Sequence, residues 1–184
     1  MEPLEPITQC LELYSLKITV SMCGVLIIND AQMGALVRKL KKLRYIQIGA
    51  ESEEWERETE TQSDLSLCSL DSLALHCPNI QYIGLMIVNF QVPSPYRIYS
   101  PFKNEMTSEF FHSPLEMTQA FPFARHLSAL CRPTSRRPPV VVRCESKEWN
   151  AVRETVNMLH SVLEVERRRI KSNAEILNHW VWGA

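Results

Sequence analysis

Three segments of the chain repeat one spacing of apolar residues, and this repeat limits the fold more than any other feature. The segments are CLELYSLKI at 10–18, LKKLRYIQI at 40–48 and CPNIQYIGL at 77–85. Each begins with Cys or Leu, and a Leu or Ile follows after steps of three, three and two residues. This change of step indicates a turn that leads into a strand with one buried face. We therefore predict a repeat fold whose units share one core.

Helical patterns precede the second and third copies. Asn29 or Asp30 offers a helix N-cap before apolar residues at helical spacing in INDAQMGALVRKL, 28–40. Before the third copy, Leu70 and Leu73 fit a short helical face, with Leu75 as a further candidate, and Pro78 ends the helix at Cys77. Helix, turn and strand therefore recur. Cys10 and Cys77 occupy the same template position, which predicts buried, structural thiols.

The copies are separated by 30 and then 37 residues, which is longer than the usual leucine-rich repeat. An acidic insert at 50–64, AESEEWERETETQSD, lies in the second interval and carries six glutamates between 51 and 60. Its charge and its lack of an apolar period predict a solvated loop or a frayed helix outside the stack.

The C-terminal half begins with residues 91–114, which contain four prolines and predict a surface loop. Three Ser-Pro dipeptides in it, at Ser94, Ser100 and Ser113, are candidate phosphorylation sites. A short helix is expected at 120–131 and a strand at 140–142, which together form a degenerate fourth unit. A long amphipathic helix follows, with one face formed by Trp149, Val152, Val156, Leu159, Leu163 and Ile170. We expect this helix to cover the end of the stack, and a coiled-coil dimer is the alternative.

Because of this repeated template, the chain resembles the leucine-rich-repeat region that follows the F-box in fungal F-box proteins of the basidiomycete type. PITQCLELYSLKI, INDAQMGALVRKLKKLRYIQIG and LDSLALHCPNIQYIGL look like successive units of that region, and EWNAVRETVNMLHSVLEVERRRI looks like its terminal helix. In that family the F-box docks onto an Skp-type adaptor of a cullin ubiquitin ligase, and the repeats hold the substrate. No F-box precedes residue 10, so an Skp-type adaptor is not expected as a partner of this chain.

The expected fold class is α/β: a short leucine-rich-repeat-like solenoid with parallel strands, closed by a long C-terminal amphipathic helix. We expect one domain over 1–184, with three repeat units in 1–90 that include the acidic insert, the proline-rich loop at 91–114, and a degenerate repeat with the capping helix at 115–184.

Enzymatic motifs are missing from the sequence. It has no Gly-rich phosphate loop, no GxSxG and no HExxH, and its six cysteines show no metal-binding spacing. A net charge of -1 gives no general attraction to nucleic acid, and the basic segments 38–44 and 166–171 are expected to be solvated faces. No secretory signal or membrane-spanning run is present. We therefore expect a non-enzymatic cytoplasmic or nuclear protein without cofactor, metal, nucleic-acid or membrane partner.

The residues between the template positions should point to the opposite, concave face of the strands, because strand side chains alternate. The candidate binding residues on this face are Lys17, Tyr45, Gln47, Tyr82 and Met86. Tyr45 and Tyr82 share a template position and should form an aromatic ladder, a residue type favoured at binding hot spots. The alternative is that they only cover the edge of the core.

The sequence thus favours a protein-interaction module resembling the substrate-recognition part of an F-box protein, with a protein partner of unknown identity. The alternative function is a truncated or remnant repeat fragment with a structural role only.

Overall fold

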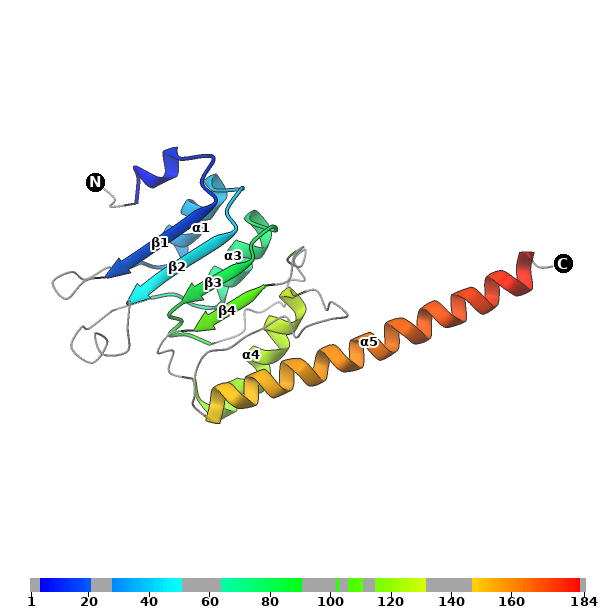
Figure 1. Ribbon diagram of the computed structural model, residues 1–184. Coiled ribbons are helices and arrows are strands. Elements are labelled where there is room, and N and C mark those ends of the chain that lie inside the picture. Colours follow the sequence, from blue (N-terminus) through cyan, green and yellow to red (C-terminus); the bar gives the residue numbers. More distant parts are fainter. Residues whose placement is uncertain are drawn as a thin grey trace.

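A computed structural model describes residues 4–20, 28–50, 64–90, 102, 106–110, 115–131 and 147–182. Its elements are η1 (Ile7–Gln9), β1 (Ser15–Val20), α1 (Asp30–Lys39), β2 (Tyr45–Ala50), α3 (Leu67–His76), β3 (Tyr82–Leu85), β4 (Thr107–Phe110), α4 (Met117–Leu130) and α5 (Lys147–Trp182). The four strands form one parallel sheet in chain order. Helices α1 and α3 lie along one side of this sheet, and α4 and α5 lie at its β4 end (Figure 1). The fold is therefore α/β with a parallel sheet and a long C-terminal helix.

The three template segments lie in register in neighbouring strands, as the repeat predicts. Leu16 is paired with Ile46, and Ile46 is paired with Ile83. All three side chains are buried, together with Ile48 and Leu85 in the next core-facing row. Burial of these rows against the helices removes apolar surface from water, which is the main favourable term in folding. The predicted shared interior of the three units is confirmed.

The same backbone contact recurs where each strand begins. The carbonyl of Tyr14 accepts hydrogen bonds from the amides of Arg44 (2.8 Å) and Tyr45 (3.1 Å). One strand further along, the carbonyl of Arg44 accepts from Gln81 (2.7 Å) and Tyr82 (3.1 Å). These contacts hold successive units at a fixed offset, so side chains at the same position in two units become neighbours.

Helix α1 begins at one of the two polar residues that the sequence suggested. Asn29 is the N-cap of α1 and forms a capping box with Gln32. Asp30 then reaches the next unit, where its carboxylate accepts from the amide of Ser66 (2.9 Å) and from the hydroxyls of Ser66 and Ser69 (both 2.5 Å). Because Ser66 is the N-cap of α3, this carboxylate fixes the start of α3 relative to α1.

The fourth strand shows that the loop prediction for 91–114 was wrong at 107–110. There β4 pairs with the edge of β3, and the amide of Thr107 donates to the carbonyl of Gln81 at 2.8 Å. Its core-facing positions are Ser108, in line with Ile83, and Phe110. Only one of these two residues is apolar, so the strand carries no repeat signal. The unsatisfied edge of β3 explains why this segment is nevertheless a strand.

An aromatic cluster connects the sheet to the C-terminal helices. The ring of Phe110 on β4 stacks on Trp149 of α5, with centroids 5.2 Å apart, and Phe123 of α4 meets both rings edge-on. Phe90, which follows β3, contacts Phe123 and Trp149 in the same way. The expected helix over 120–131 is confirmed as α4, and its residues Phe123, Leu127 and Leu130 are buried.

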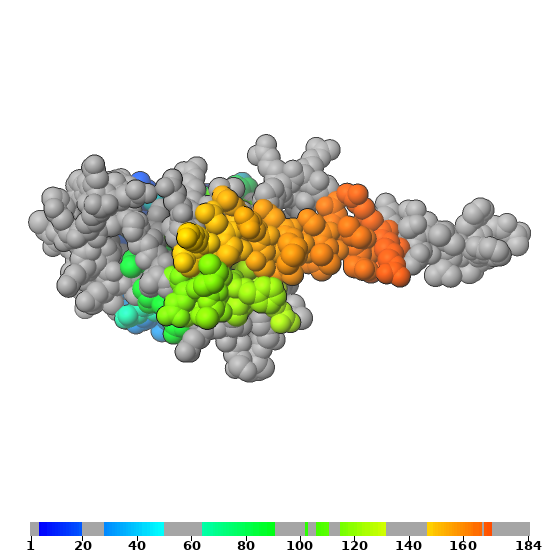
Figure 2. All heavy atoms as spheres, turned by 90° about the horizontal axis from the view of Figure 1, so that it is seen from below, coloured from blue at the N-terminus to red at the C-terminus, as the bar shows by residue number. Residues whose placement is uncertain are grey.

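Among the described side chains of α5, the buried ones all lie in the first half of the helix, where α5 packs against α4. Trp149, Val152 and Val156 are buried, whereas Leu163 and Ile170 are exposed. Figure 2 shows α4 beside the start of α5 and the following residues of α5 extending past it. The expectation that all six residues of the predicted face cover the core was wrong for these two, because α4 ends before it reaches them. No helix in the described part of the chain is long and apolar enough to cross a membrane.

The first unit is less well covered than the others. Cys77 is buried, as predicted, but Cys10 at the same template position is exposed. The reason is that α1 and α3 cover the later units, whereas the single turn of η1 precedes Cys10. Leu75, the additional candidate on the α3 face, is 52% exposed.

Several expectations fall outside the residues that the structure describes. They are the character of the acidic insert, the strand at 140–142 and the three Ser-Pro sites.

Candidate interaction surface

Two tyrosines on the helix-free face of the sheet form the centre of the candidate site. Tyr45 on β2 and Tyr82 on β3 are paired in register, and both point away from the core rows. Their rings stack with centroids 4.3 Å apart and an interplanar angle of 6°. Both side chains are half-buried, so each keeps part of its surface toward solvent. The predicted aromatic ladder is therefore present.

Polar groups fix both phenol hydroxyls. The Tyr45 hydroxyl donates to Oε1 of Gln47, two residues further along β2, at 2.5 Å. The Tyr82 hydroxyl donates to the carboxylate of Glu109 on β4. Burial raises the pKa of Tyr82, and the hydrogen bond to Glu109 and that carboxylate's negative charge raise it further. Tyr82 therefore remains a neutral donor at physiological pH, and the rings are held in one orientation.

The other candidate residues surround this pair. Lys17 and Gln47 are paired across β1 and β2 in the next outward-facing row, where Gly84 and Glu109 follow. Lys17 is exposed, and Gln47 is half-buried. Met86 directly follows β3 and is also half-buried.

Thr107 and the buried Glu109 lie on the same face of the sheet, and neither was among the residues expected there. They lie on the strand that the repeat template did not predict. The alternation of Thr107 and Glu109 with Ser108 and Phe110 was a weak strand signal in the sequence.

A polar pair lies inside the molecule, between α3 and α4. Nε2 of His126 is 3.0 Å from Oδ1 of Asp71, and both residues are buried. A substrate in solvent has no access to a pair that is enclosed in this way, so we assign it a structural role. Within the residues described, no group of three His, Cys, Asp or Glu side chains is placed to hold a metal ion.

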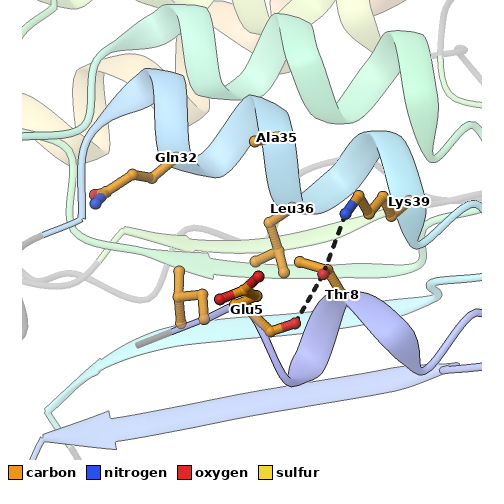
Figure 3. A pocket seen from close by; sticks show the side chains of 7 residues that line it. Glu5, Thr8, Gln32, Ala35, Leu36 and Lys39 are labelled. Carbon is orange, nitrogen blue, oxygen red and sulfur yellow. Dashed lines mark hydrogen bonds between the residues drawn. The ribbon is translucent and has the colours of Figure 1, made fainter. Parts of the chain in front are cut away.

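A pocket of about 270 Å³ lies between η1 and α1. Leu4 and Leu36 supply apolar lining, and Glu5, Thr8 and Lys39 supply polar groups. Figure 3 shows Thr8 between Glu5 and Lys39: its hydroxyl donates to the carbonyl of Glu5 at 2.8 Å and accepts from Nζ of Lys39 at 3.3 Å. These two contacts occupy the Thr8 hydroxyl.

A scan against protein-family models, a search of curated proteins and a search of solved structures return no match for this chain. The surface formed by Tyr45, Tyr82 and their neighbours is therefore the feature that bears on function.

Proposed function

We propose that the chain is a non-enzymatic protein-interaction module of the leucine-rich-repeat type, resembling the substrate-recognition part of a fungal F-box protein. Its binding surface is the helix-free face of the sheet, with Tyr45 and Tyr82 at the centre and Lys17, Gln47 and Met86 around them. The partner is a protein. An Skp-type adaptor is not proposed as a partner, because the resemblance covers the repeats and not the F-box.

The observation that carries the proposal is the stacked, hydrogen-bonded tyrosine pair on a face that the helices leave open. Rigid tyrosines lose little conformational entropy on binding and combine an apolar ring with a polar hydroxyl, which makes them frequent binding hot spots. The recurring strand-start contacts support the repeat-type description, because they place equivalent residues of successive units side by side.

The test is affinity capture from a fungal lysate with mass spectrometry, using the wild-type chain and the double variant Tyr45→Ala/Tyr82→Ala. The matched control is Phe121→Ala, which removes an aromatic ring that is 55% exposed on α4, away from the sheet face. We expect the control to retain the captured protein and the double variant to lose it. The same captured protein on all three baits would refute the proposed surface.

Loss of folding is the competing explanation for a loss of capture. Removing the ring stack should cost about 1 kcal/mol, and losing the hydrogen bond from Tyr82 to the Glu109 carboxylate should add about 1–3 kcal/mol. Tyr82→Phe in place of Tyr82→Ala keeps the stack and the fold, and its capture separates the hydroxyl from the ring. Peptides of an Skp-type adaptor in the captured material would show that the chain recruits a ubiquitin ligase.

The alternative function is a purely structural set of repeats without binding of its own. The open flank of α1 beside η1, where the pocket lies, favours it. Thermal unfolding distinguishes the two. A cooperative transition supports a self-sufficient module, whereas a molten product that binds hydrophobic dyes supports the structural alternative.

A further inference from the structure

A second exposed surface lies at the edge of the sheet where the strands begin. The chain enters β2 through a tight turn in which the amide of Leu43 donates to the carbonyl of Leu40 at 3.0 Å. Both leucines are buried, while the residues around them, Lys41, Lys42 and Arg44, are exposed. The buried leucines therefore anchor a turn that directs its cations into solvent.

Equivalent positions of the first two turns are neighbours at this edge. Arg44 lies over the ring of Tyr14, with its guanidinium carbon 5.6 Å from the ring centroid. Lys42 pairs with Glu12 at 2.5 Å. Each pair is separated by 30 residues, the same offset that pairs Ser15 with Tyr45. The side chains at this edge are therefore positioned by the register of the sheet.

In the part of the chain that the structure describes, most of the positive charge at this edge has no carboxylate partner. Among the described residues, Arg38 and Lys41 contact no carboxylate, and the contact of Arg44 is with the Tyr14 ring. Burial lowers the pKa of His76, and the positive charges of Arg38 and Lys41 lower it further, so the field of these two cations extends to the end of α3. Of the described cations at this edge, Lys42 is the one that pairs with a carboxylate, that of Glu12.

Apolar surface accompanies these cations. Tyr14 is 50% exposed and Leu11 is 59% exposed, and Leu11 occupies the turn position that Lys41 occupies in the next unit. Arginine, an aromatic ring and an exposed aliphatic side chain together are the composition of a protein-protein interface. We propose that this basic turn edge, formed by Leu11, Tyr14, Arg38, Lys41 and Arg44, binds an acidic segment of a partner protein.

Charge count favours a protein over a nucleic acid. Tight binding to a duplex commonly involves six to ten phosphate contacts, two to three times the number of cations in the basic turn edge, which are Arg38, Lys41 and Arg44. A net charge of -1 for the whole chain provides no long-range attraction to a polyanion either. A short acidic segment with an apolar or aromatic residue matches both the charge and the Leu11–Tyr14 surface.

The test is fluorescence anisotropy with a short fluorescein-labelled peptide of glutamates around one tyrosine. The same peptide with glutamine in place of glutamate, and a labelled DNA duplex, serve as comparison probes. We expect the glutamate peptide to bind and its affinity to fall as salt is added, because exposed charges are screened over about 8 Å at physiological ionic strength. Lys41→Glu/Arg44→Glu should weaken binding by about tenfold or more.

The matched control is Arg168→Glu/Arg169→Glu on α5, which changes the net charge equally at two exposed arginines that already pair with glutamates. It should retain binding within about twofold of the wild type. Equal loss in both double variants, tighter binding of the duplex, or no binding of the glutamate peptide would each overturn the proposal. If the glutamate variant does not fold by circular dichroism, Lys41→Gln/Arg44→Gln replaces it, with the same expected direction.

This inference does not depend on the proposed function. The Tyr45→Ala/Tyr82→Ala variant should bind the glutamate peptide normally, because both tyrosines lie on the sheet face. Failure of the tyrosine surface and failure of the basic turn edge are thus distinguishable.

Discussion

A single carboxylate connects two units at the residue scale. Asp30 is half-buried and accepts three hydrogen bonds from the first residues of α3. Asp30→Ala leaves the Ser66 amide and two hydroxyls without this acceptor, so we expect the free energy of unfolding to fall by about 2–3 kcal/mol in urea titrations. Asp64→Ala is the control, because Asp64 is exposed and its hydrogen bond to the carbonyl of Ile28 is donated by its backbone amide. Equal losses in the two variants would contradict this role for Asp30.

Cysteine reactivity is also decided at the residue scale. Burial raises the pKa of Cys77 and of Cys131 to about 12, whereas Cys10 and Cys68 are exposed. At pH 8 a thiol with such a pKa is ionised in about one molecule in ten thousand, and the thiolate is the reactive form. Iodoacetamide labelling followed by peptide mapping should modify Cys10 and Cys68 in the native protein, and Cys77 and Cys131 only in denaturant. Rapid native labelling of Cys77 would show that the second and third units open readily.

At the element scale, the two halves of α5 offer the same side chain in opposite environments. Val156 is fully buried near Trp149, whereas Val165 is 64% exposed. Val156→Ala should lower the free energy of unfolding by about 2 kcal/mol, and Val165→Ala should change it by less than about 0.5 kcal/mol. Chemical denaturation of both variants measures the difference. A comparable loss from Val165→Ala would mean that the second half of the helix is covered in solution.

The elements that the sequence predicted are those with a buried apolar period. The three template strands, α1, α3 and α4 each place Leu, Ile, Val or Phe at regular steps, so their existence and their register followed from spacing. Strand β4 could not be found in this way, because its core row contains Ser108 and its identity depends on the free edge of β3. The residues of the candidate site fall into the same two groups, those predicted from spacing and those that were not. Tyr45 and Tyr82 were predicted from their shared position, whereas the Glu109 carboxylate that fixes Tyr82 required the three-dimensional pairing.

At the scale of the whole molecule, burial decreases from the inner units toward β1. Ile46 and Ile83 are completely buried, Leu16 is 7% exposed, and Ile18 is only half-buried. We expect the amide hydrogens of β2 and β3 to exchange only through global unfolding. The amide hydrogens of β1 that are bonded to β2 should exchange through a local opening with a lower free energy. Native-state hydrogen exchange with mass spectrometry measures both. Slower exchange in β1 than in β3 would contradict this order.

The helix α5 gives the molecule a mechanical property that its sheet lacks. It has 36 residues, about 54 Å, and the buried side chains among its described residues lie in the first half. From Trp149 to Trp182 the helix axis rises by about 50 Å. A tilt of about 10° at the aromatic cluster around Trp149 would displace the far end by about 9 Å, so a small repacking beside β4 would become a movement that a probe at the tip could measure.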